Sequence, residues 1–130
     1  MPSYDRAIFS PPAPLARVVL RHPLTRAIVA DVPMLLDSGA DVTLLPQAAA
    51  DQLRLQAVPH ESYELVGFDG SRSVARAVQA DLLFLDRTFK GRFLLTSQEW
   101  GLLGRDILNH LSLLLDGPQL TWSDRQRPES

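Results

Sequence analysis

The chain of 130 residues contains no cysteine and only one lysine, Lys90. Without cysteine it can form no disulfide, thiol nucleophile or thiolate metal site, so proteins that depend on these groups are excluded. The other strongly basic residues are scattered arginines, and the formal net charge is −2. Because phosphate backbones bind to clustered Lys and Arg, we expect no nucleic-acid partner.

Long hydrophobic runs are also missing from the sequence. The uninterrupted apolar segments are only a few residues long, whereas a membrane-spanning helix needs about 20 apolar residues. The N-terminus does not show the basic and then apolar order of a signal peptide. We therefore expect no membrane partner and a cytoplasmic location. A content of 45% hydrophobic and 22% charged residues is typical of one globular domain.

The three histidines, His22, His60 and His110, are far apart in the sequence and lie in no carboxylate-containing motif. A zinc site and a Ser/His/Asp triad are therefore not expected. The sequence also has no Gly-rich phosphate loop and no dinucleotide fingerprint. We predict a protein without metal and without cofactor.

The pattern of apolar residues predicts a mostly β protein with three parts. Residues 1–14 contain four prolines, which cannot donate ladder hydrogen bonds, and are expected to form an extended arm. Residues 15–123 are expected to form the folded domain, and residues 124–130 a polar tail. Within the domain, strands are predicted at residues 16–20, 27–32, 75–85 and 88–96, a hairpin around residues 63–74, apolar segments at 111–115 and 120–122, and a short helix at residues 47–53.

An acidic loop, Asp37-Ser38-Gly39-Ala40-Asp41, lies between two apolar segments that are typical of buried strands, residues 32–36 and 42–46. A carboxylate at the end of a buried strand is well placed for chemistry. An Asp at such a position is also a common turn former, because its side chain accepts hydrogen bonds from nearby backbone N–H groups. The loop alone leaves both interpretations open.

A second segment, Leu102-Leu103-Gly104-Arg105-Asp106-Ile107-Leu108, gives the loop a companion. The two segments together resemble the signatures of retropepsin-like (retroviral-type) aspartic proteases, an Asp-Thr/Ser-Gly-Ala loop and a hydrophobic-hydrophobic-Gly-Arg-Asp/Asn segment. The resemblance implies a mostly β half-barrel with a short helix after Gly104-Arg105-Asp106. It also implies a homodimer.

Aspartic proteolysis requires two carboxylates around one water molecule, one protonated to polarise the substrate carbonyl and one ionised to accept a proton from the water. This chain contains a single Asp-Ser/Thr-Gly sequence. We therefore predict that Asp37 is catalytic and meets its copy from a second subunit across a two-fold axis. The predicted function is an endopeptidase acting on an extended peptide. The alternative is a catalytically silent dimer that binds a peptide or protein, because a fold does not determine a function.

Four neighbours of Asp37 are predicted to support the loop. The Ser38 hydroxyl can bond across the dimer axis, and Gly39 allows a tight turn behind the carboxylate. Asp41 is predicted to form a bidentate pair with Arg105, which would tie the loop to the second segment. Asp106 is predicted to cap the helix that follows it.

The substrate is expected to lie between the loop and a hairpin. Asp69-Gly70 is typical of a tight turn between two strands. By resemblance, this hairpin would be the flap that closes over bound peptide, although an ordinary hairpin remains an equal alternative. The predicted substrate-binding residues are Ala40, Val42, Gly67, Phe68, Asp69, Gly70 and Leu102. Trp122 is predicted to pack at a dimer seam.

Overall fold

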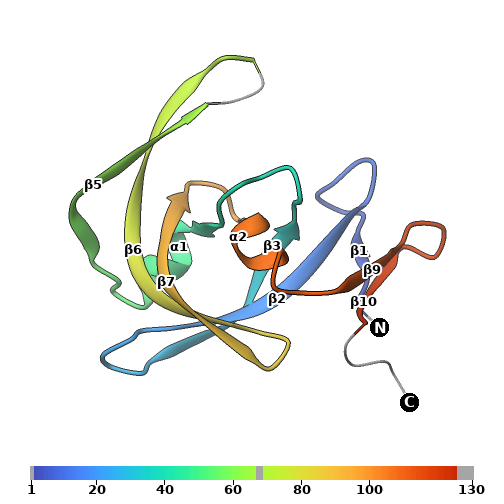
Figure 1. The fold of residues 1–130 in the computed structure, drawn as a ribbon, viewed down its shortest axis with the longest axis horizontal. Helices are drawn as coiled ribbons and strands as arrows, with labels where there is room; N and C mark the ends of the chain where they lie inside the picture. Colours follow the sequence, from blue (N-terminus) through green and yellow to red (C-terminus); the bar gives the residue numbers. More distant parts are fainter. Residues whose placement is uncertain (1, 67–68, 126–130) are drawn as a thin grey trace.

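Most of the chain folds into one sheet that closes on itself (Figure 1). The computed structural model describes residues 2–66 and 69–125. Its strands are β1 (Tyr4–Asp5), β2 (Ala13–Arg21), β3 (Ile28–Leu36), β4 (Leu44–Pro46), β5 (Ala57–Val66), β6 (Arg72–Phe84), β7 (Arg87–Thr96), β8 (Gly101–Leu103), β9 (Leu113–Asp116) and β10 (Thr121–Asp124). The helices are α1 (Gln47–Gln52) and α2 (Arg105–Leu108). The predicted mostly β fold is confirmed.

The order of strands in the large sheet is β1-β2-β3-β8-β4-β7-β6-β5, and β2 pairs in addition with β6. This extra pairing joins distant parts of the sheet and produces the half-barrel. Two neighbouring pairs in the middle, β3 with β8 and β4 with β7, are parallel. Because β3 and β8 run in the same direction, the segments that follow them emerge side by side at one edge of the barrel.

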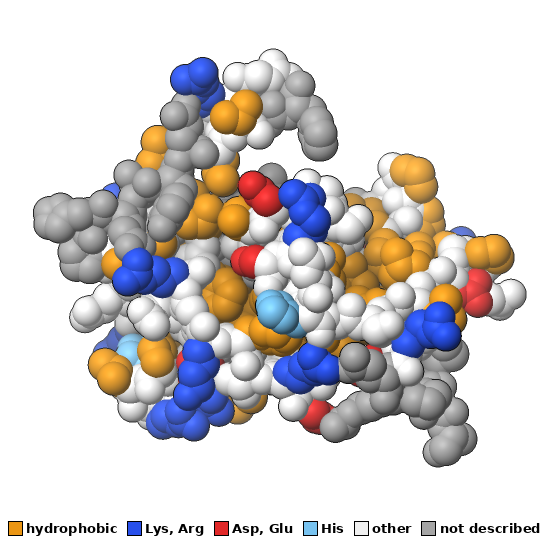
Figure 2. Space-filling view, viewed as in Figure 1, with side chains coloured by type: hydrophobic (Ala, Val, Ile, Leu, Met, Phe, Trp, Pro, Cys, Tyr) orange, Lys and Arg blue, Asp and Glu red, His pale blue; other side chains and the backbone are white. Residues whose placement is uncertain are grey.

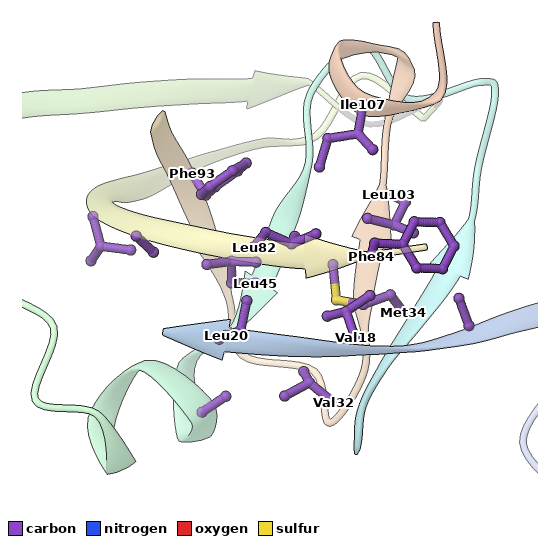
Figure 3. Packing of buried hydrophobic residues seen from close by; sticks show 14 of the residues in the cluster. Val18, Leu20, Val32, Met34, Leu45, Leu82, Phe84, Phe93, Leu103 and Ile107 are labelled. Carbon is purple, nitrogen blue, oxygen red and sulfur yellow. The ribbon is translucent and has the colours of Figure 1, made fainter. Parts of the chain in front are cut away.

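The core fills the inside of this barrel. In β2, Ala16, Val18 and Leu20 recur at every second residue and are buried, as expected for a strand with one face on the core. Figure 3 shows Val18, Met34 and Leu103 converging from three different strands. The packing of Leu103 against β2 and β3 holds β8 in place beneath the loop that follows β3.

The short helices lie close to their predicted positions. Helix α1 follows Pro46 and ends one residue before the predicted boundary. Helix α2 begins at Arg105, directly after β8, in agreement with the expected helix after Gly104-Arg105-Asp106. Neither helix is long and apolar enough to cross a membrane.

The two ends of the described chain lie together on one side of the molecule (Figure 1). Tyr4 pairs with Pro14 in β2, and a bridge joins Ser3 to Thr121 of the β9–β10 hairpin. Trp122 is buried, and its indole N–H donates to the Leu15 carbonyl at 3.0 Å. Its predicted place at a dimer seam is therefore wrong, because the ring packs in the core of its own chain. Most of the predicted tail, residues 126–130, lies outside the described residues.

Candidate active site

Asp37 directly follows β3, at the point where β3 and β8 reach the edge of the barrel together. Its backbone N–H donates to the Leu103 carbonyl at 3.1 Å, so the parallel pairing of β3 with β8 extends to the candidate catalytic residue. The buried Leu103 side chain anchors this contact in the core. The carboxylate is thus carried by two strands and not by a free loop.

The loop turns back tightly after Asp37. The Gly39 N–H donates to Asp37 Oδ1 at 3.0 Å, and the Ala40 N–H donates to the Asp37 carbonyl at 3.2 Å. A Cβ atom at position 39 would lie 3.2 Å from the same Oδ1, which is a tight contact. Glycine at this position lets the backbone pass close behind the carboxylate, as expected for Gly39.

Arg105 supports the loop, but through different atoms from those predicted. Its guanidinium Nη1 donates to the Ser38 carbonyl at 2.8 Å, and its backbone N–H donates to the Ala40 carbonyl at 2.8 Å. Within residues 2–66 and 69–125, no ion pair joins Arg105 to Asp41. The tight turn directs a backbone oxygen toward the guanidinium, and the exposed Asp41 carboxylate stays at the rim of the site.

Gly104 allows the two segments to approach one another. A Cβ atom there would lie 2.5 Å from the Val42 carbonyl oxygen and 3.0 Å from the Ala40 carbonyl oxygen. Any side chain at this position would push the loop away from α2. The glycine of the second signature segment is therefore required by close packing.

Thr43, which was not among the predicted site residues, connects the loop to α2. Its hydroxyl donates to Asp106 Oδ1 at 2.6 Å, its N–H donates to Asp106 Oδ2 at 3.1 Å, and the Gly104 N–H donates to the hydroxyl oxygen at 3.1 Å. Asp106 therefore does not cap the helix as predicted: Gly104 is the N-cap residue and provides no side-chain bond. A single Thr within the apolar segment 42–45 was a usable signal, because a buried hydroxyl requires partners.

The loop forms one wall of a pocket of about 380 Å³. Six predicted site residues lie in its lining, together with three that were not predicted. The predicted ones are Asp37, Gly39, Ala40, Asp41, Val42 and Leu102, and the others are Leu44, Leu65 and Val66. Leu65 and Val66 belong to β5, so the predicted flap hairpin contributes to the pocket wall. Asp37 thus lines a mostly apolar cleft and is only half-buried.

The β5–β6 hairpin rises from the barrel and curves over the Asp37 loop (Figure 1). Gly67 and Phe68, predicted at its tip, lie outside the described residues. Asp69 and Gly70 lie at the tip and not in the pocket lining, and Gly70 has φ of +83°, as the predicted turn requires. Two hydrogen bonds from Ser71 lower the pKa of Asp69. The larger effect comes from the Ser71 hydroxyl, and the smaller from its backbone N–H, which donates to Asp69 Oδ1 at 2.9 Å.

The described residues contain no group of three His, Asp or Glu side chains that could hold a metal ion. The chemical groups gathered at the pocket are a carboxylate, backbone amides and apolar side chains. A carboxylate of this kind can accept or donate a proton for a bound water molecule. Among the residues that line the pocket, Asp37 and the exposed rim residue Asp41 carry carboxylates.

Comparison with known proteins agrees with this geometry. The structure resembles the EIAV protease complexed with the inhibitor HBY-793, with a TM-score of 0.59 and 23% sequence identity over 75% of this chain and 86% of that chain. It also resembles the foamy viral protease-reverse transcriptase in complex with an RNA/DNA hybrid, with a TM-score of 0.52 and 10% identity over 75% of this chain and 12% of that chain. No curated protein sequence matches.

The sequence itself matches a protein family. Residues 29–107 match the family described as "Aspartyl protease", and this range contains both the Asp37 loop and the Gly104-Arg105-Asp106 segment. The match and the fold support aspartic protease activity in general terms. The chain therefore belongs to the aspartyl protease family and has the retropepsin-like fold.

Proposed function

We propose that this protein is an aspartic endopeptidase whose catalytic centre is completed by a second copy of the chain. The observation that carries the proposal is the position of Asp37, at the end of β3 with its side chain in the lining of an open cleft. One chain contains a single Asp-Ser/Thr-Gly sequence. Two copies related by a two-fold axis would bring two such loops together.

The two Asp37 carboxylates would hold one water molecule between them and share one proton, since two charges so close cannot both stay ionised cheaply. The ionised carboxylate takes a proton from the water as its oxygen attacks the peptide carbonyl carbon. The protonated carboxyl donates to the carbonyl oxygen. When the carbon–nitrogen bond breaks, the amine takes a proton from the dyad and leaves. One hydroxyl of the tetrahedral intermediate gives its proton back to the dyad as the carboxylic acid product forms, so the two carboxylates again share one proton.

The cleft favours an extended peptide with apolar side chains near the scissile bond. Val42, Leu44 and Leu102 form an apolar floor, and Leu65 and Val66 approach from the hairpin. An extended peptide can add main-chain hydrogen bonds to a strand edge while its alternate side chains fill pockets. Closure of the hairpin over the peptide would exclude water from the reacting atoms.

The test compares the wild type with Asp37→Asn on an unstructured protein substrate, from mildly acidic to neutral pH. Asparagine keeps the shape of the side chain but cannot accept the proton, so we expect activity to fall by on the order of 10³-fold. Asp51→Asn, at an exposed position of α1, is the matched control and should keep full activity. A wild type that binds peptide without cleaving it would instead establish the silent binding module.

Mixing the two proteins tests the shared site separately. If each site needs an Asp37 from both subunits, excess Asp37→Asn protein will capture wild-type chains in mixed dimers and reduce their activity. Excess Asp51→Asn protein should not reduce it. Activity that is unaffected by excess Asp37→Asn protein would mean that one chain carries a complete site, which contradicts the proposal.

A further inference from the structure

The β9–β10 hairpin presents an unpaired strand edge at the end of the molecule where the two chain ends meet (Figure 1). In the part of the chain that the structure describes, β9 pairs with β10 alone. The other edge of β10 is already occupied by the N-terminal segment of the same chain, since the Trp122 N–H donates to Pro2 and the Tyr4 N–H donates to Leu120. A partner therefore cannot interlace its own terminus with β10 without breaking these bonds.

The register shows which backbone groups face outward from β9. The Trp122 N–H donates to the Pro2 carbonyl at 3.0 Å and therefore points away from β9. In an antiparallel pair, the residue opposite such a position also directs its N–H and C=O away from the ladder. Leu115 lies opposite Trp122, and Leu113 lies opposite Asp124 in the same alternation. The backbone groups of Leu113 and Leu115 thus face the open edge.

The side chains around this edge are apolar and accessible. Leu114 is 48% exposed, Leu115 is 53% exposed, and Ile8 of the neighbouring 6–12 loop is 48% exposed. Figure 2 shows hydrophobic side chains gathered at this end of the molecule, over the N-terminal loop and the hairpin. Natural proteins usually protect a free edge with Lys, Pro or a covering element, so an open apolar edge marks a contact surface.

We infer that β9 is the dimer edge of this protein, and that it pairs antiparallel with β9 of a second copy to form a four-stranded sheet β10-β9-β9-β10. The two-fold axis passes beside Leu114, so that Leu113 of one subunit bonds to the partner subunit's Leu115. A second copy fits because an antiparallel edge is complementary to itself under two-fold symmetry. This inference rests on the proposed function, which requires a partner, and it names the surface that brings the partner.

The hairpin edge provides only part of the contact area. A stable dimer buries more than about 1,000 Å² in total, which is more than two short strand edges supply. In Figure 1 the 6–12 loop lies at the same end of the molecule as the hairpin, so it can supply part of the remaining area.

The first test measures amide hydrogen exchange of the wild-type protein by NMR at low and high protein concentration. The N–H groups of Leu113 and Leu115 should become protected as the concentration rises, while the Leu114 N–H, which faces β10, should be protected at both concentrations. If the Leu113 and Leu115 N–H groups exchange equally fast at both concentrations in a protein that dimerises and cleaves, the inference that β9 is the dimer edge is wrong. The proposed peptidase function is then retained. A wild type that stays monomeric at high concentration overturns both.

The second test is a substitution. Leu114→Asp places a charge at the axis of the inferred sheet, and sedimentation should show a dimer weakened by about tenfold or more. Leu24→Asp is the matched control, because Leu24 is also a large exposed apolar residue but lies at the opposite hairpin, between β2 and β3. It should leave the dimer unchanged. Equal dimer affinity of the Leu114→Asp variant overturns the inference, and if this variant fails to fold, the exchange data on the wild type decide.

Discussion

The two walls of the candidate active site are built differently. The Asp37 loop is held by β8, by Arg105 and by the Thr43–Asp106 contact, and a Cβ atom at Gly104 would meet backbone atoms at 2.5 Å. The β5–β6 hairpin projects from the barrel, and Gly70 at its tip has nothing within 4 Å of a Cβ position. One wall is therefore fixed around the carboxylate by packing and hydrogen bonds, whereas the other has free space around Gly70.

The same substitution in the two walls should therefore have unequal effects. Gly104→Ala forces Val42 and Ala40 to shift, and we expect the free energy of unfolding to fall by about 3 kcal/mol. In Gly70→Ala the new methyl group has free space, but the alanine must adopt a φ of +83°. We expect the free energy of unfolding to fall by only about 1 kcal/mol. Urea unfolding measures both values. Equal losses would show that the loop has as much freedom as the hairpin tip.

The buried hydroxyl of Thr43 provides the next largest effect. Thr43→Val keeps the shape of the side chain but leaves the Gly104 N–H and one Asp106 oxygen without their partner. We expect a loss of about 2 kcal/mol in the free energy of unfolding and a lower kcat, because the Asp37 loop loses its hydrogen bonds to α2. Thr43→Ser restores the hydroxyl and should recover most of the loss. If Thr43→Ser is as destabilised as Thr43→Val, the missing methyl and not the hydrogen bond matters.

A pair of exposed valines on the hairpin separates binding from stability. Val66 is 67% exposed and lines the pocket, whereas Val74 is 75% exposed and does not. Val66→Ala should raise KM for peptide a few-fold, and Val74→Ala should not. Neither change should alter the free energy of unfolding by more than about 0.5 kcal/mol, as is usual for exposed positions. A similar KM for both variants would mean that β5 does not contact substrate.

The smallest effect concerns the pH response of the hairpin tip. Two hydrogen bonds from Ser71, first from its hydroxyl, lower the pKa of Asp69 below its ordinary value of 3.8. A carboxyl group whose pKa is lower in the folded state stabilises the turn at pH values above its ordinary pKa. This stabilisation is lost as the pH falls through the folded-state pKa. An NMR titration should show the low pKa in the wild type and a pKa nearer 3.8 in Ser71→Ala. An unchanged pKa in that variant would contradict the assigned cause.

Local features of the chain could be predicted from its sequence. The mostly β fold, both short helices and the turn at Asp69-Gly70 depend on residues that are neighbours in the sequence. The same is true of the Asp37 loop, because an Asp-Ser-Gly turn after an apolar strand is visible without any knowledge of the fold. These features needed only the alternation of apolar residues and the turn preferences of Asp and Gly.

Contacts between distant residues could not be predicted in this way. Thr43 and Asp106 are 63 residues apart, and Arg105 is 67 residues from Ser38, so their pairing depends on the parallel approach of β3 and β8. Opposite charge alone predicted a pair between Asp41 and Arg105 instead. Trp122 was misplaced for the same reason, since its partner Leu15 is 107 residues away.

Residue types and local spacing were thus enough to find the acidic Asp37 loop after an apolar strand, and the resemblance to a known family linked it to the Gly104-Arg105-Asp106 segment. The partners of each polar group, the apolar roof from Leu65 and Val66, and the open edge of β9 followed only from the order of strands in the sheet. The physical reason is that turns and strands are selected by nearby residues, whereas hydrogen-bond partners and free edges are selected by which strands become neighbours when the chain closes into a barrel.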